Sequence, residues 1–356
     1  MRRCEVGGMK KSRKTFISNI ITYGMVILAF AVCQAMMEGG MMTRSLKGQL
    51  VPICVYVVMA VSLNLTVGIS GELSLGHAGF MSVGAFSGIV MSTWLAGAFQ
   101  VESVALRLAA ALVTGGVTAA IAGVLIGIPV LRLRGDYLAI VTLAFGEIIR
   151  NLLNCVYFSM DSGRLYFGFS NPNLPGKMFV NGPMGATGVQ KLATFTAGFL
   201  LVMFTLFVVL NLINSRSGRA IMAIRDSRIA AESVGINVTK YKMMAFVTSA
   251  ALAGMAGALY GLNYSTVAAV KFKFDTSILI LVFVVLGGIG NIRGSVIAAT
   301  LLTVLPEVLR EFGDYRMLVY AVVLILVMLA TNSPLLGRLM ARVRPARGEA
   351  RKEGEA

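Results

Sequence analysis

The sequence has little of what a soluble enzyme needs. Its 356 residues include a single histidine, four cysteines and one tryptophan, and only 13% of them are charged. It contains no G-x-x-x-x-G-K-[ST] phosphate loop, no H-E-x-x-H zinc motif and no G-x-S-x-G nucleophile turn. ATP hydrolysis is therefore excluded as this chain's own activity, and we predict no catalytic residue, no cofactor and no metal.

The few reactive side chains do not form a cluster in the sequence. The cysteines, at positions 4, 33, 54 and 155, are too far apart for a zinc or redox motif, so we interpret them as small apolar residues. The lone His77 is expected to be a hydrogen-bonding structural residue. A membrane enzyme using Glu72 and His77 is disfavoured because no second nucleophile or metal cluster accompanies them.

Apolar runs dominate the chain instead. It is 57% hydrophobic with a mean hydropathy of +0.80, and its runs of about 20 residues match the thickness of a bilayer. We predict an all-α polytopic transmembrane bundle of about 8–10 spans with Gly-rich broken or re-entrant segments. The candidate spans are 17–37, 48–68, 80–98, 104–130, 137–156, 192–213, 243–265, 276–289, 295–310 and 316–333. The eighth and ninth are short, and the Gly-rich stretch 286–295 makes them either one broken helix or a re-entrant pair.

The basic residues that give the chain its net charge of +16 lie in short segments between the apolar runs. They therefore indicate membrane topology rather than nucleic-acid binding. With the N-terminus in the cytoplasm, the inner segments hold 21 of the 32 lysines and arginines and the outer segments nine. This excess predicts that both termini are cytoplasmic. The predicted parts are a basic N-terminal tail (1–16), a permease domain (17–336) with an outer loop (157–190) and an inner loop (214–242), and a basic C-terminal tail (337–356). The run at 17–37 is expected to be a retained anchor.

Two polar regions inside the apolar runs are candidates for a solute pathway. Glycines recur from 68 to 88 near Asn64 and Glu72, a pattern typical either of close helix packing or of a discontinuous helix that lines a solute route. Glu147 and Arg150 lie on one helix face, and Glu147 is about 18 Å along the helix from Gly135, near the bilayer midplane. We expect either a structural ion pair or a polar lining of the route.

The inner loop carries a helical pattern. Residues from Arg219 to Val234 form an expected amphipathic helix, ended by Gly235 and followed by a span rich in Ala and Gly. Such a helix is suited to docking in the cytoplasm. Asp226 and Glu232 weaken the alternative of a basic helix lying on lipid.

Four motifs together resemble the permease subunits of branched-chain amino acid ABC importers, the LivM-type subgroup. They are SLNLTVGISGELSLGHAGFMSVGA (62–85), RGDYLAIVTLAFGEIIRNLL (134–153), SGRAIMAIRDSRIAAESVGINVTKYK (217–242) and LGGIGNIRGSVIAA (286–299). The third resembles the E-A-A-x-x-x-G coupling segment of such permeases, with Ile229 in the place of the Glu. The resemblance implies that the ATPase-coupling residues are Arg219, Arg225, Asp226, Ala230, Ala231 and Gly235.

The resemblance also implies the partners and the location. The complex would contain a second homologous permease in a heterodimer, two ABC ATPases and an extracytoplasmic solute-binding protein, in the lipid of a bacterial inner membrane. The solute would be a branched-chain or other hydrophobic amino acid, although permeases for urea or short amides share the architecture. From the residues alone, an ion-coupled secondary transporter with a proton site at Glu72 or Glu147 is the competing class.

Overall fold

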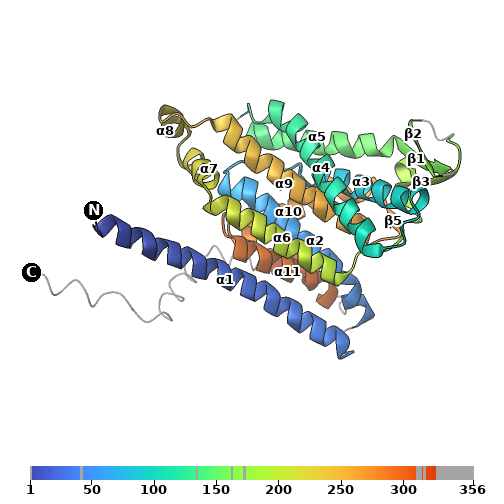
Figure 1. Cartoon of the computed structure of the whole chain (residues 1–356), viewed down its shortest axis with the longest axis horizontal. Coiled ribbons are helices and arrows are strands. Elements are labelled where there is room, and N and C mark those ends of the chain that lie inside the picture. The colour runs from blue at the N-terminus through green and yellow to red at the C-terminus, as the bar shows by residue number, and fades with distance from the viewer. Residues whose placement is uncertain are drawn as a thin grey trace, which may run out of the picture. The chain divides into compact units, whose positions relative to one another are not determined.

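A computed structural model describes residues 2–40, 43–133, 135–161, 163–170, 174–309, 315 and 318–325. Figure 1 shows that most of this part of the chain is helical, as predicted. The helices are α1 (Arg2–Glu38), α2 (Arg44–Asn64), α3 (His77–Ala98), α4 (Val104–Val130), α5 (Asp136–Asn154), α6 (Phe195–Asn214), α7 (Arg216–Asp226), α8 (Arg228–Ser233), α9 (Val238–Gly261), α10 (Phe274–Gly287) and α11 (Ile292–Val308).

Seven helices among the described residues are long and apolar enough to cross a membrane, and α10 is a shorter apolar helix. The spans predicted at 276–289 and 295–310 are two separate helices, α10 and α11, joined by a tight turn that contains Gly288 and Gly290. Both glycines have φ near +85°, at 89° and 83°, a backbone region that other residues rarely adopt. Of the tenth predicted span, residues 318–325 are helical and the rest lies outside the described residues, as does the predicted tail 337–356.

The chain divides into two units, Met1–Val304 and Leu305–Ala356, and the core lies in the first. The window around α2 is the most buried of the candidate spans, with 89% of its residues buried. Helices α3, α4 and α9 approach closely at three glycines: a Cβ on Gly115 would lie 3.0 Å from the Gly84 carbonyl oxygen and 3.1 Å from that of Gly254. The glycines therefore serve close packing at this level of the bundle.

The loop predicted at 157–190 contains strands, which the sequence interpretation missed. They are β1 (Val156–Asp161), β2 (Arg164–Phe169), β3 (Lys177–Asn181) and β4 (Ala186–Thr187), and β5 (Thr266–Val267) joins them from the other side of α9. The five strands form one antiparallel sheet, in which their order is β2-β1-β3-β4-β5. Figure 1 places the strands at the opposite end of the helices from α7 and α8.

The prediction of a single helix from Arg219 to Val234 is wrong, because the structure has two helices, α7 and α8, that are separated by Ser227. Ser227 is extended, with φ −156° and ψ 107°, and its hydroxyl accepts a hydrogen bond from the Ala230 N–H. A serine in this role caps the start of a helix, which makes a second short helix more favourable than continuation of the first.

Candidate docking segment and solute route

Helices α7 and α8 and the first turn of α9 form a small folded unit, here called the docking segment (216–242). Ile224, Ala231 and Val238 are buried together at its centre. The turn after α8 is closed by Gly235, whose φ is +81°, and by a hydrogen bond from the Ile236 N–H to the Ala231 carbonyl. This is a Schellman ending, which favours glycine at that position. The segment is therefore held in a defined shape.

The outward side of the docking segment exposes apolar side chains. Ile229 on α8 is 83% exposed and Val234, directly after it, is 75% exposed. Arg219, Asp226 and Ala230 are also exposed. Ile229 and Val234 thus make little contact within this chain, and exposed apolar side chains of this kind are typical of a protein contact. Of the predicted coupling residues, Ala231 and Gly235 instead maintain the segment's own shape.

Arg225 lies between the docking segment and the spanning helices. Its Nη1 donates to the Gly68 carbonyl at 2.9 Å, and its Nε and Nη2 contact Asp226 at 3.2 and 3.1 Å. Lys242, on the first turn of α9, forms an ion pair with Glu72. The sequence assigned Arg225 to coupling and Glu72 to the solute route, and the structure brings both to the same short segment after α2.

Asn64 makes contacts inside the bundle. Its amide nitrogen donates to the Ser295 hydroxyl at 2.8 Å, and its amide oxygen accepts from the Gly290 N–H at 2.8 Å. The side chain is fully buried, which fixes the end of α2 to the turn between α10 and α11. His77 is likewise buried and lies 2.8 Å from the Ser62 hydroxyl through Nε2, which agrees with a structural hydrogen bond.

Glu147 and Arg150 form an ion pair on α5, with 2.7 Å between Oε2 and Nε. The second carboxylate oxygen accepts from the Phe274 N–H at 3.3 Å, at the start of α10. A carboxylate at a helix N-terminus is stabilised by the exposed N–H groups there. The side chain of Glu147 remains 32% exposed, and only 17% of the apolar window of α5 is buried within this chain.

Lipid is a poor environment for that exposed charge, since inserting a charged residue at the bilayer centre costs about 2.5–3.5 kcal/mol. This face of α5 therefore needs water or another protein against it. The structure shows the predicted ion pair, whereas the polar lining of a solute route stays a prediction.

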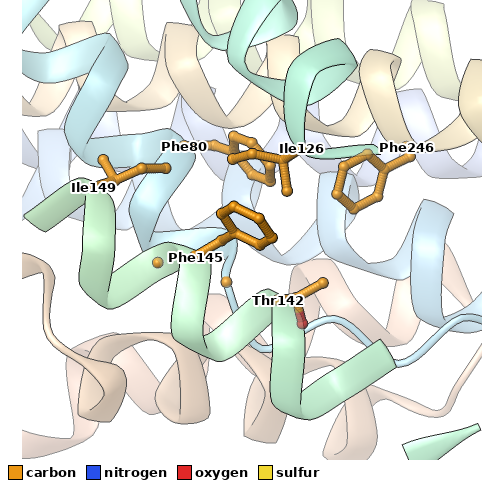
Figure 2. A pocket seen from close by; sticks show the side chains of 8 residues that line it. Phe80, Ile126, Thr142, Phe145, Ile149 and Phe246 are labelled. Carbon is orange, nitrogen blue, oxygen red and sulfur yellow. The ribbon is translucent and has the colours of Figure 1, made fainter. Parts of the chain in front are cut away.

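An aromatic pocket lies against another face of α5, which carries Thr142, Phe145 and Ile149 (Figure 2). Phe145 of α5 points toward Phe80 of α3, with Ile126 of α4 and Phe246 of α9 alongside. The pocket has no room for a water molecule. An open aqueous channel does not run through this point of the chain in the present conformation.

The described residues contain no group of three or more His, Cys, Asp or Glu side chains that would hold a metal ion. A bundle of apolar helices long enough to cross a membrane, with a folded polar segment between two of them, defines a multi-pass helical membrane protein.

The particular family follows from comparison with known proteins. Residues 45–329 match the family described as "Branched-chain amino acid transport system / permease component", and the chain belongs to that family. No solved structure gives a significant match.

Named relatives agree with this membership. The chain is 36% identical over 313 residues to the high-affinity branched-chain amino acid transport system permease protein LivM of Salmonella typhimurium, which covers 84% of this chain and 72% of that protein. It is 30% identical over 290 residues to BraD of Pseudomonas aeruginosa, covering 80% and 92%. It is also 32% identical over 149 residues to LivH of Salmonella typhimurium, covering 41% and 46%.

Proposed function

We propose that this chain is the permease subunit of an ATP-driven importer that carries branched-chain amino acids across a bacterial inner membrane. The observation that carries the proposal is the family match across residues 45–329, which includes six of the seven candidate spans and the docking segment. The chain has no phosphate-binding loop, so in an ATP-driven importer a separate ATPase would supply the energy. The exposed Ile229 and Val234 give such an ATPase an apolar contact on the docking segment.

The proposed complex has a second, different permease, two ATPases and an extracytoplasmic solute-binding protein. The chain is similar to both LivM and LivH of Salmonella typhimurium, which are two different permease proteins of one organism. This supports a complex in which two different permeases form a heterodimer. The charged face of α5 would then lie against the second permease. At such an interface Glu147 and Arg150 would border the solute route without meeting lipid.

The proposed orientation places the docking segment and both termini in the cytoplasm. The excess of lysine and arginine in the segments on that side supports it. The test is a single cysteine at the exposed Ser233, in a chain whose four native cysteines are replaced by alanine. A membrane-impermeant maleimide should label it in inside-out vesicles and leave it unlabelled in right-side-out vesicles. The reverse pattern would place the docking segment away from the ATP supply and refute the proposal.

The decisive functional experiment reconstitutes the five proteins in proteoliposomes and follows labelled leucine. We expect uptake that requires ATP and the solute-binding protein, and that stops when either ATPase is omitted. Labelled urea and acetamide, run in parallel, test the alternative substrate class. Uptake of urea in preference to leucine would assign the chain to that class.

The competing transport class has a separate outcome. An ion-coupled transporter would carry leucine with this chain alone, driven by a proton gradient and insensitive to ATP. Glu147→Gln and Glu72→Gln would then abolish the dependence on the gradient. Absence of any gradient-driven uptake by the isolated chain, with ATP-driven uptake by the complex, supports the importer.

A further inference from the structure

The segment between α2 and α3, residues 65–76 and here called the hinge segment, departs from regular helix structure. It begins as one π-helical turn, Leu65–Ile69, in which all five residues are buried. The turn is closed by a hydrogen bond from the Ser70 N–H to the Leu65 carbonyl at 3.1 Å. Wide helical turns of this kind are rare and occur mostly at functional positions. The rest of the segment is not helical up to His77.

The docking segment holds the hinge segment at two points. Arg225 donates to the Gly68 carbonyl, and its stem covers Gly71, where a Cβ would lie 2.6 Å from the Arg225 Cγ. Lys242 forms its ion pair with Glu72, and these two side chains are only 13% and 14% exposed. One contact comes from the last turn of α7 and the other from α9, so two separate parts of the docking segment hold the same few residues.

The opposite side of the hinge segment lies against the turn between α10 and α11. A Cβ on Gly68 would stand 2.7 Å from the Cα of Gly290, so the two backbones are in direct contact. Asn64, one residue before the π-helical turn, bonds to both Gly290 and Ser295. A displacement of the hinge segment must therefore displace this turn as well, because close-packed backbones transmit rather than absorb movement.

The far end of the hinge segment connects to the helices around the solute route. The Leu75 N–H donates to the Thr142 hydroxyl of α5 at 3.0 Å, and the Ala78 N–H donates to the Ser277 hydroxyl of α10 at 3.1 Å. Directly before these contacts, the Ser74 hydroxyl is buried and has no hydrogen-bond partner among the described residues. The two hydrogen bonds therefore tie the end of the hinge segment to α5 and to α10.

We propose that Arg225, Glu72 and Lys242 are positioning residues that transmit movement of the docked ATPase to the hinge segment and thereby to α5 and α10. The inference rests on the proposed function and states how the docking segment acts on the proposed solute route. The Glu72–Lys242 ion pair and the Arg225–Gly68 hydrogen bond are the physical link. Cutting either one leaves the ATPase docked and hydrolysing ATP, with less solute carried for each ATP consumed.

The experiment measures leucine uptake and ATP hydrolysis in the same proteoliposomes that contain the complete complex. The variants are Glu72→Gln, Lys242→Met and Arg225→Met, together with the double exchange Glu72→Lys and Lys242→Glu. The matched controls are Lys47→Met, an exposed lysine of α2 outside the docking segment, and Glu102→Gln, an exposed glutamate. The amount of ATPase that co-purifies and the unfolding temperature are recorded for every variant.

We expect the single variants to lower the uptake per ATP about tenfold or more, which corresponds to about 1.4 kcal/mol of lost coupling. Their ATPase content should stay at the wild-type level, and the double exchange should recover most of the ratio. The unfolding temperature of Glu72→Gln and Lys242→Met should fall, because each variant leaves a largely buried charge without its partner. The controls should match the wild type. An unchanged uptake per ATP in Glu72→Gln and Arg225→Met would overturn the inference.

A purely structural role has its own signature. In that case the single variants lose ATPase content and unfolding temperature together, while the uptake per ATP of the remaining complex stays at the wild-type value. That result would also overturn the inference. Failure of the proposed function is distinct, since the wild-type complex would then show no ATP-driven uptake at all.

Discussion

The exposed isoleucine on α8 offers the sharpest test of how this permease meets its ATPase. Ile229 is 83% exposed, whereas Ile224 in the same docking segment is 3% exposed. The two side chains are chemically identical, so replacing each by alanine separates a docking role from a folding role. Truncation of isoleucine removes three carbons, each worth about 0.8 kcal/mol when buried.

For Ile229, the energy of the three carbons is multiplied by the exposed fraction, because only that part of the side chain can become buried when the ATPase docks. The result is about 2 kcal/mol, which corresponds to a roughly 30-fold weaker association. Because the side chain makes little contact within its own chain, the stability of Ile229→Ala should change by no more than about 0.5 kcal/mol. For Ile224→Ala the reverse applies, since a buried isoleucine cut to alanine costs about 2–5 kcal/mol of stability.

The assay titrates fluorescently labelled ATPase onto the permease pair in lipid nanodiscs and measures the dissociation constant, with thermal unfolding followed on the same samples. Ile229→Ala should weaken binding with an unchanged unfolding temperature. Ile224→Ala should lower the unfolding temperature. If Ile229→Ala binds the ATPase within threefold of the wild type, the outward face of α8 is not the docking surface and the reasoning fails.

Three further outcomes follow from the bundle and the sheet. Gly84→Val should destabilise the chain by about 1–3 kcal/mol or abolish expression, because its Cβ would collide with the backbone of α9. The control Gly48→Ala should unfold at the wild-type temperature, because no atom lies within 4 Å of the added Cβ. Glu147→Ala should cost about 1.5–3 kcal/mol for the lost charged hydrogen bonds, and adding Arg150→Ala should cost less than the sum of the two single changes in thermal unfolding. Phe167→Ser, which removes a 61% exposed ring from edge strand β2, should reduce stimulation of ATP hydrolysis by the solute-binding protein while basal hydrolysis stays constant; equal stimulation would exclude that strand from the contact.

The helices were predictable because a bilayer imposes a strong and local rule. An apolar run of about 20 residues must be a helix to satisfy its own backbone in lipid, and this rule needs no knowledge of neighbours. The predicted spans at 104–130 and 192–213 accordingly agree closely with α4 and α6. The family resemblance was also legible from four contiguous motifs, and the family match confirms it.

The strands after α5 were not predictable in the same way. Their stability depends on pairing with other strands, and β5 pairs with β4 although the helices from α6 to α9 lie between them in the chain. A two-residue strand has no pattern of its own, so only the partner's position defines it. The break at Ser227 was missed for a subtler reason: a serine is compatible with both a helix interior and a cap, and the packing of Ala231 against Ile224 decides between them.

By itself, the sequence determined that this is a helical membrane protein that resembles permease subunits, and it identified which residues are charged within the spans. Only the tertiary structure decided what those residues contact. Glu72 pairs with Lys242 across 170 residues, and Arg225 reaches Gly68 across 157. Contacts so far apart in the chain leave no local periodicity, because they arise only when separately stable helices pack side by side.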